Sequence, residues 1–378
     1  MLQNREEKAV RKASVVTGLF GALGVMLGSG AAMAQPIRLG AVLPLTGPAA
    51  VIGTQEQRGV QFAIDEVNAK GGIGGHQIEV IFEDNQAKPD QSVLLFNKLV
   101  DLQKVPVVFT GYSGPSLAMA PLATRKKTLL VNGGAQADAL DKASPYLINT
   151  IPVLAGELEV LANYLFADAG KKTAAILFEN NAAGIAGRDD FLGSYEKAGD
   201  KILAQEPVQF GDTNYRPALL KLAAAQPEVL FVVITSGTPQ LADQIRQIDA
   251  KFMVAGNTFF SDPELIANPN AEGFTHTQVL INAPEGMAAA FKTKYGTEFD
   301  FFPKQYYNAA TVVLACIEKL VKENRPVTGE ALRAALFEIK TFKGLTTTVF
   351  NTNTAATQIN MNRITAKADT TIKVIPPK

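Results

Sequence analysis

The first part of the chain alternates short apolar runs with stretches of helical periodicity. Residues 37–43 form an apolar run of strand length, and apolar positions in residues 60–67 recur at i, i+3, i+4 and i+7, as in an amphipathic helix. The glycine-rich residues 71–75 predict a helix-to-strand turn with positive φ, and residues 78–82 predict a second strand. This strand–helix–strand unit predicts two parallel strands with a ligand crevice beyond their C-terminal ends, where loop 44–53 leads into a helix N-terminus.

The same alternation continues and then restarts after Pro152, which marks a crossover. Further strands are predicted at 105–110, 128–131, 146–151, 173–178, 202–208, 229–234 and 252–254, and helices at 90–102, 115–123, 156–167, 189–198, 215–225, 239–248, 285–295, 305–322 and 329–337. Residues 346–377 are rich in Thr, Ile and Val and predict short strands. Two successive blocks of domain size predict an α/β fold with two doubly wound parallel-sheet lobes.

Residues 1–34 have the pattern of a cleavable signal peptide. A positively charged beginning precedes the mostly apolar residues 15–27, and Ala32-Met33-Ala34 matches an A-x-A cleavage site. The alternative, a membrane anchor, is disfavoured because a span needs about 20 apolar residues. The mature chain is therefore predicted to begin at Gln35 and to be exported.

The composition of the chain bears on its cellular compartment and on whether it binds nucleic acid. The 378 residues carry 36 basic and 36 acidic side chains, and a leader with four bases and two acids leaves a net charge of about −2. Such a balance gives no sign of a nucleic-acid partner. Cys316 is the only cysteine, so the chain forms no internal disulfide and has no lipidation cysteine after the leader. A soluble periplasmic protein without a membrane anchor is predicted.

Catalytic and metal chemistry is poorly supported. The glycines at 71–75 do not fit G-x-G-x-x-G, and G-x-x-x-x-G-K-[ST] is absent from the sequence. Ser113 lies in Gly111-Tyr112-Ser113-Gly114-Pro115, which lacks the second glycine of G-x-S-x-G. His76 and His276 are the only histidines, are predicted to be structural, and have no zinc-ligand spacing. No catalytic residue, metal or cofactor is therefore predicted.

Polar side chains follow the predicted strand ends, where a ligand crevice is expected. They are Thr46, Ser113, Ser116, Gln136, Asn180, Asn181, Thr235, Ser236, Asn257 and Thr258. Any one of them alone is equally well explained as a helix cap. Together they predict a polar, uncharged cleft between two lobes.

Several segments resemble periplasmic solute-binding proteins of branched-chain amino acid ABC importers. The similar segments are IRLGAVLPLTGP at 37–48, Gly53, RGVQFAIDEVNAKGGIGG at 58–75, EDNQAKPD at 83–90, GDTNY at 211–215, YG at 295–296 and YYNAA at 306–310. The resemblance implies a type I periplasmic-binding fold with three crossovers. It implies a first lobe of residues 35–153 plus 283–353, and a second of 154–282 plus 354–378.

The resemblance also implies a ligand site. Ser113, or Ser116, with Ala135 and Gln136 would hold a ligand carboxylate, and Ile52 would lie over the ligand. In the second lobe the chain departs from the family pattern. Ala183 stands where an aromatic residue is common, and Thr258, followed by Phe259, stands where amino-acid binders carry an acid for the ammonium. Burying an ammonium without an acid is costly, so an aromatic or other organic carboxylate is the alternative ligand.

We therefore expect the extracytoplasmic solute-binding component of an ABC importer. It would act as a monomer without catalysis, capture a small amino acid-like or organic-acid solute between lobes closing about residues 150–154 and 282–284, and deliver it to the permease and ATPase subunits. A sensory or receptor ligand-binding domain is the other alternative. The predicted ligand-binding residues are Thr46, Ile52, Ser113, Ser116, Ala135, Gln136, Asn181, Ala183, Ser236, Thr258 and Phe259.

Overall fold

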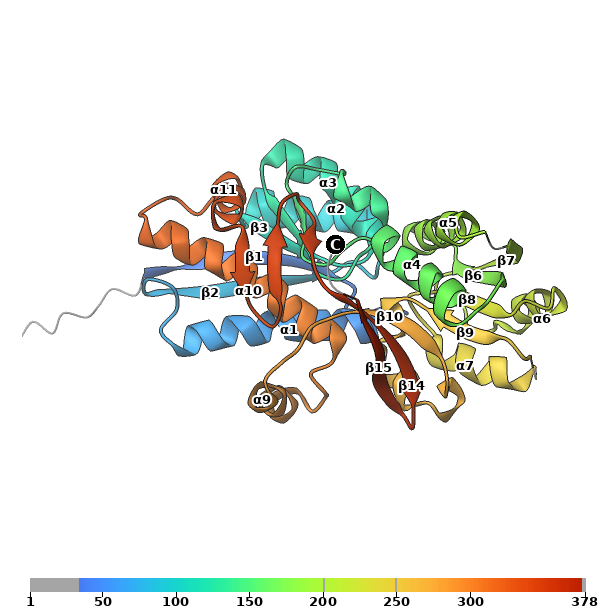
Figure 1. Cartoon of the computed structure of the whole chain (residues 1–378). Helices are drawn as coiled ribbons and strands as arrows, with labels where there is room; N and C mark the ends of the chain where they lie inside the picture. The colour runs from blue at the N-terminus through green and yellow to red at the C-terminus, as the bar shows by residue number, and fades with distance from the viewer. Residues whose placement is uncertain (1–33, 200, 249, 376–378) are drawn as a thin grey trace, which may run out of the picture. The chain divides into compact units, whose positions relative to one another are not determined.

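The computed structural model describes residues 34–375 except residues 200 and 249. These residues form one compact unit with two large β-sheets and one small one (Figure 1). The predicted signal peptide lies outside the described residues apart from Ala34. Within the described part of the chain, none of the helices combines the length and apolar character that a membrane crossing requires.

The first sheet has five parallel strands in the order β2-β1-β3-β4-β5. Its strands are β1 (Ala34–Leu43), β2 (His76–Asp84), β3 (Val107–Thr110), β4 (Leu129–Asn132) and β5 (Leu147–Asn149). The connecting helices are α1 (Ala50–Ala69), α2 (Pro89–Asn97) and α3 (Ser113–Lys126), and a π-helical turn, Lys98–Leu102, extends α2. The pattern-based strands and helices of this region are confirmed, with ends shifted by a few residues.

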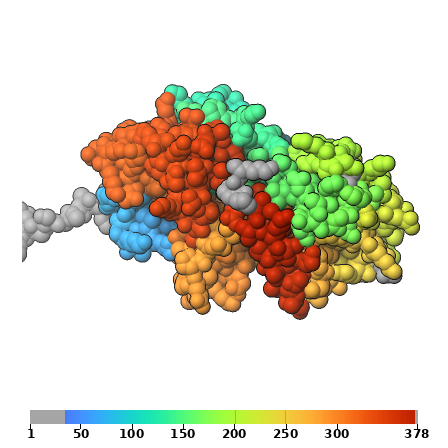
Figure 2. All heavy atoms as spheres, viewed as in Figure 1, coloured from blue at the N-terminus to red at the C-terminus, as the bar shows by residue number. Residues whose placement is uncertain are grey.

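Segments from opposite ends of the sequence share this half of the fold. The late helices α9 (Glu285–Tyr295), α10 (Phe301–Lys322) and α11 (Gly329–Ile339) join α1 in one apolar core on one face of the five-stranded sheet. Helices α2 and α3 enclose a second apolar core on the other face. In Figure 2 the orange surface of the late helices adjoins the blue surface of the N-terminal segment. The five-stranded sheet is therefore buried on both faces, as parallel sheets require.

The second sheet has seven strands in the order β15-β14-β10-β9-β8-β6-β7. Five strands are parallel: β6 (Thr173–Glu179), β7 (Lys201–Val208), β8 (Val229–Val233), β9 (Met253–Gly256) and β10 (Thr275–Val279). Helices α4 (Leu154–Asn163) and α5 (Ala182–Lys197) cover one face, and a π-helical turn, Tyr164–Asp168, extends α4. Helices α6 (Arg216–Ala224), α7 (Thr238–Gln247) and α8 (Pro263–Ala267) cover the other.

Two features of this sheet differ from the expectation. Strands β14 (Ile359–Thr365) and β15 (Ala368–Ile375) pair antiparallel at its edge, so the sheet is mixed rather than wholly parallel. Strand β10 was not predicted because its residues Thr275, His276 and Thr277 are polar, yet all three are fully buried. Hydrogen bonds compensate their burial: His276 bonds to Asp369 at 3.0 Å, and Thr277 donates to Glu157 at 2.6 Å.

The chain passes between the two large sheets three times. It leaves β5 for α4, returns from β10 to α9, and leaves again after a small antiparallel sheet of β11 (Thr341–Lys343), β12 (Thr347–Phe350) and β13 (Ala355–Ala356). The passages are tied by backbone hydrogen bonds: Leu154 donates to Gln136 at 2.8 Å, and Leu280 donates to Gln358 at 2.8 Å. The fold is thus a type I periplasmic-binding fold, with an α/β unit on each large sheet.

Candidate ligand-binding site

A small pocket lies beyond the C-terminal ends of strands from both large sheets. Its free volume is about 20 Å³, which is room for about one water molecule. Its residues follow β1, β3 and β4 in one sheet and β6, β8 and β9 in the other, and one comes from the start of α10. They are Ile52, Glu56, Tyr112, Ser113, Gly134, Ala135, Ala183, Thr235, Phe259 and Phe302. Parallel strands of both sheets therefore place their following loops around one space.

Glu56 provides a carboxyl group to this pocket from α1. Its side chain is only 1% exposed. Burial raises the pKa of Glu56 to about 8, and the neighbouring Tyr306 hydroxyl opposes that shift in part. Among the described residues, none hydrogen-bonds to Oε2 of Glu56. The pocket thus contains a carboxyl oxygen with free capacity to accept a hydrogen bond.

Two glycines allow the Glu56 carboxyl to approach the strand ends. A Cβ at Gly111 would lie 2.6 Å from Oε2 of Glu56 and 2.8 Å from the Tyr306 hydroxyl oxygen. A Cβ at Gly134 would lie 3.1 Å from Oε1 of Glu56. Gly111 therefore needs to lack a side chain for the carboxyl to remain where it is, and a side chain at Gly134 would be in tight contact with it. The Tyr306 hydroxyl donates to the Thr110 carbonyl at 2.7 Å and thereby attaches α10 to the end of β3.

Tyr112, directly before α3, has an unusual backbone. Its φ is 63°, in the left-handed region that a bulky residue seldom adopts. Such a conformation costs on the order of 1–3 kcal/mol and is found most often at functional sites. The ring lies edge-on to Phe210 with centroids 6.1 Å apart. Burial raises the pKa of the Tyr112 phenol well above its ordinary value, and none of the described side chains or backbone groups hydrogen-bonds to its hydroxyl.

Ser113 follows Tyr112 and lies at the N-terminus of α3. Its hydroxyl oxygen accepts a hydrogen bond from the Ala137 amide at 3.2 Å, which leaves the hydroxyl proton available to a ligand. The amides of Gly134 and Ala135 donate to the side-chain oxygen of Asn132, at 3.1 and 2.7 Å. The amide of Ala135, expected to hold a carboxylate, therefore already has a partner within the chain.

A second buried carboxylate organises the wall formed by the seven-stranded sheet. Glu179 ends β6 and accepts hydrogen bonds from Asn181 at 2.6 Å, from the Thr235 amide at 3.2 Å and hydroxyl, and from Ser236 at 3.1 Å. Burial raises the pKa of Glu179, and these four hydrogen bonds lower it in part. Glu179 is thus satisfied within the protein and holds the loops after β6 and β8 together.

A third buried carboxylate, Glu157 on α4, explains the positions of two expected site residues. The side-chain amide of Gln136 donates to Glu157 at 2.7 Å and to the Pro152 carbonyl at 3.1 Å. The backbone amide of Thr258 donates to Glu157 at 2.6 Å. The Thr258 hydroxyl accepts from the Val279 amide at 3.2 Å. Gln136 and Thr258 therefore join the wall of the pocket to the first passage between the sheets.

The residues predicted for the site fall into two groups. Ile52, Ser113, Ala135, Ala183 and Phe259 line the pocket, and Ser236 lines an adjoining groove that shares Ile52, Thr235 and Phe259 with it. The predicted residues that lie outside both are Thr46, Ser116, Gln136, Asn181 and Thr258. Each of these has a structural partner: Thr46 bonds to Asp84 at 2.5 Å, Ser116 bonds to Thr110 at 3.0 Å, and Asn181 caps α5 through Gly184.

Four other lining residues, Glu56, Tyr112, Gly134 and Phe302, were not predicted, and for Glu56 the sequence pattern could have indicated a role in the site. Glu56 lies on the buried stripe of α1, one turn after Gly53 and Ile52 and one turn before Gly59 and Val60. A carboxyl on the apolar face of an amphipathic helix is a candidate functional group, since charged residues are rarely fully buried. Tyr112, Gly134 and Phe302 carried no such signal. Thr235 was among the polar strand-end residues but not in the predicted site.

The described residues hold no group of three or more His, Cys, Asp or Glu side chains arranged to hold a metal ion. The described lining of the pocket combines polar and apolar groups. Its polar groups are the carboxyl of Glu56 and the hydroxyls of Tyr112, Ser113 and Thr235, and the remainder of its lining is apolar or backbone.

Comparison with known proteins agrees with the fold. The chain is 28% identical over 318 residues to the leucine-, isoleucine-, valine-, threonine- and alanine-binding protein of Pseudomonas aeruginosa, covering 82% of this chain and 85% of that protein. A solute-binding protein of an R. palustris ABC transporter, solved with benzoate, superposes with a TM-score of 0.82 at 18% identity, covering 91% of this chain and 97% of that one.

A second solved structure has a different ligand. The branched-chain amino acid transporter substrate-binding protein of Streptococcus pneumoniae, solved with isoleucine, superposes with a TM-score of 0.80 at 23% identity, covering 89% and 99% of the two chains. Residues 36–370 match the family model described as periplasmic binding protein. Since this match spans nearly all of the described residues, the chain belongs to the periplasmic binding protein family.

Proposed function

We propose that the protein is the extracytoplasmic solute-binding component of an ABC importer. It captures a small amino acid-like or organic-acid solute between two closing lobes and delivers it to the permease. The observation that carries this proposal is the pocket that both sheets line and that contains a buried carboxyl oxygen without a partner among the described residues. The amino acid and benzoate complexes of proteins with this fold support the size and class of the solute.

The apolar lining and Ser113 contact different parts of such a solute. Ile52, Phe259 and Phe302 surround its apolar part, and Ala183 leaves room where a larger side chain would project. The Ser113 hydroxyl donates to a solute oxygen, since its own oxygen already accepts from Ala137. Ser236 and the adjoining groove form the approach to the pocket. The site therefore binds and releases a solute without changing it, and the protein is not an enzyme.

The proposal also covers the lobe boundaries, the closure of the lobes and the processing of the chain. The lobes divide at residues 153, 282 and 353, and the solute stabilises their closed arrangement about the passages at 150–154 and 282–284. Cleavage after Ala34 releases a monomer without a lipid anchor into the periplasm, where the permease and its ATPase subunits complete the importer.

Thermal-shift screening of residues 35–378 tests the function. Amino acids and aromatic acids are each added at millimolar concentration, and we expect one chemical class to raise the melting temperature, because a solute that binds only the folded state stabilises it. Turnover of the bound solute would indicate an enzyme instead. A flat response across both classes would contradict a transport function for small organic solutes.

A further inference from the structure

The described lining of the pocket contains an acidic side chain and no basic one. Glu56 is the only lining residue with an acidic or basic side chain, and the described lining contains no Lys, Arg or His to balance it. Ligand pockets usually place a few polar groups so as to match the ligand. A carboxyl without a basic neighbour is matched by a solute that brings a hydrogen-bond donor, and most strongly by one that brings a positive charge.

The carboxyl of Glu56 is also held in a fixed position. It lies against Gly111, where a methyl group would clash with its oxygens, and against Gly134, where a methyl group would be in tight contact, and it is 1% exposed. Tyr306 of α10 and Tyr112 of the loop after β3 are the titratable groups that face it. Its Oε2 is without a partner in the described part of the chain. A buried polar atom without a partner destabilises the folded protein, and a charged one does so more strongly, so a bound donor recovers this loss.

From this geometry we propose that Glu56 is the specificity-determining residue of the site and accepts a hydrogen bond from a protonated amine of the solute. This inference rests on the proposed solute-binding function and names the solute class more narrowly. The solute then carries an amine at Glu56 and an apolar part against Ile52, Phe259 and Phe302.

Two positions on the opposite wall of the pocket that could hold an amine already have partners within the protein. Thr258 stands where the sequence resemblance places an acid, and its amide and hydroxyl bond to Glu157 and Val279. Glu179 on the opposite wall already accepts four hydrogen bonds from Asn181, Thr235 and Ser236. The acid therefore comes from α1 rather than from the wall formed by the seven-stranded sheet.

The protonation of Glu56 predicts that an amine-bearing solute releases a proton when it binds. Because burial raises the pKa of Glu56 to about 8, most molecules of the free protein carry a proton on this carboxyl at pH 7. An incoming ammonium favours the ionised form, so the O–H bond of Glu56 breaks and its proton passes to the buffer. A solute that presents only a carboxylate leaves the proton on Glu56.

Titration calorimetry on the mature chain tests the inference. The probes are L-leucine with 4-methylpentanoate, and L-phenylalanine with 3-phenylpropanoate, since each pair differs only in the amine. Titrations at pH 7 in buffers of different ionisation enthalpy give the number of protons released. We expect the amine-bearing member to bind with release of close to one proton, and Glu56→Gln to weaken it about 100-fold.

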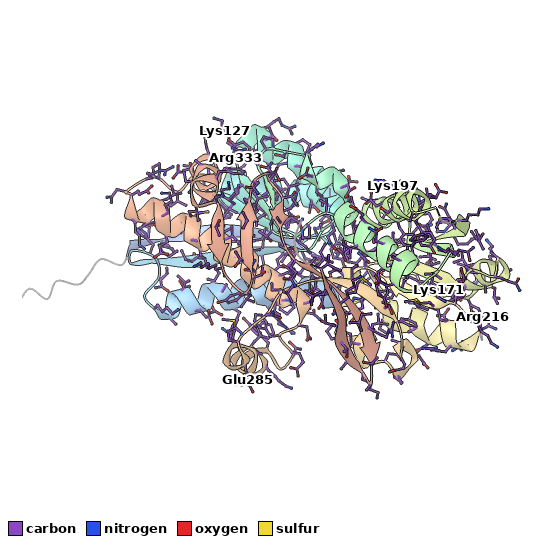
Figure 3. All side chains as sticks on the ribbon, viewed as in Figure 1. Lys127, Lys171, Lys197, Arg216, Glu285 and Arg333 are labelled. Atoms are coloured by element: carbon purple, nitrogen blue, oxygen red, sulfur yellow. The ribbon has the colours of Figure 1, made fainter. Side chains whose placement is uncertain are left out.

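The control is Glu285→Gln, which removes one carboxylate at the start of α9, where Figure 3 shows Glu285 at the edge of the fold. It should leave affinity and proton release unchanged. Equal binding of the member without the amine, an absence of proton release by the wild-type protein, or unchanged affinity in Glu56→Gln would each overturn the inference while the solute-binding function stands. Failure of every probe in both this titration and the broader screen would remove the proposed function and the inference with it.

Discussion

The buried carboxyl of Glu56 predicts an unusual dependence of stability on pH. Its pKa is about 8 in the folded protein and near 4.5 when exposed, so the folded state retains a proton that the unfolded state releases between these values. The free energy of unfolding therefore falls as pH rises, with a slope of about 1.4 kcal/mol per pH unit from this group. Below pH 4.5 the contribution is fully present, and above pH 8 it is lost.

Glu56→Gln isolates this contribution because glutamine keeps the shape and cannot ionise. Between pH 5 and pH 8 the wild-type protein should lose about 4 kcal/mol more stability than the variant does. For a chain of this length that corresponds to roughly 6 °C in the difference between their melting temperatures. The two proteins should be close in stability at pH 5, and the variant should be the more stable at pH 8.

Thermal and urea unfolding of the wild-type protein, Glu56→Gln and the surface control Glu285→Gln at pH 5, 6, 7 and 8 measure this difference. Other groups titrate equally in all three proteins, so the differences between them report Glu56 alone. Parallel stability curves for wild type and Glu56→Gln would refute the assignment of a neutral, buried carboxyl at this position.

Three further substitutions test the packing of the site. Gly111→Ala brings a methyl group within 2.6 Å of the Glu56 carboxyl, so unfolding experiments should show a loss of about 1–3 kcal/mol. The matched control Gly156→Ala lies on the exposed face of α4 with open space around it and should gain about 0.5–1 kcal/mol. Ser113→Ala should weaken solute binding about tenfold, since it removes a hydroxyl donor, and should lower stability by about 1–3 kcal/mol, because the Ala137 amide loses its acceptor. Gln136→Ala should lower stability by about 1–2 kcal/mol, because it removes a donor to a buried carboxylate, and should change solute binding little. Equal effects of these two substitutions on binding would contradict the distinction between a residue that lines the pocket and one that lies behind it.

The fold was predictable because apolar patterning follows burial in most of its elements. Strands β3 and β4 of the first sheet are mostly apolar runs, and helix α1 has the expected periodicity. Strand β10 was not predicted because its side chains are polar. Their burial is made possible by hydrogen-bond partners that lie far away in sequence, such as Asp369 for His276. The antiparallel pairing of β14 and β15 could not be predicted either, since the direction of these strands depends on where the chain enters the second sheet after its third passage between the sheets.

The site was predictable only in part, for a similar reason. Strand-end position pointed to Ser113 and the family resemblance to Ala135, and both line the pocket, because parallel strands bring their C-terminal ends to one edge. Gln136 and Thr258 occupy equivalent positions but turn toward Glu157, and a partner on α4 cannot be recognised from local sequence. Glu56 lies on a helix rather than in a loop, and only the fold shows that this stretch of α1 faces the pocket.

A crystal structure of the mature chain with the solute that most raises its melting temperature tests whether this pocket is the binding site. We expect one solute molecule per chain in the pocket, with its donor group within hydrogen-bond distance of Glu56 Oε2, an oxygen near the Ser113 hydroxyl and its apolar part against Phe259 and Phe302. A solute bound elsewhere on the chain, with this pocket left closed and unchanged, would contradict it.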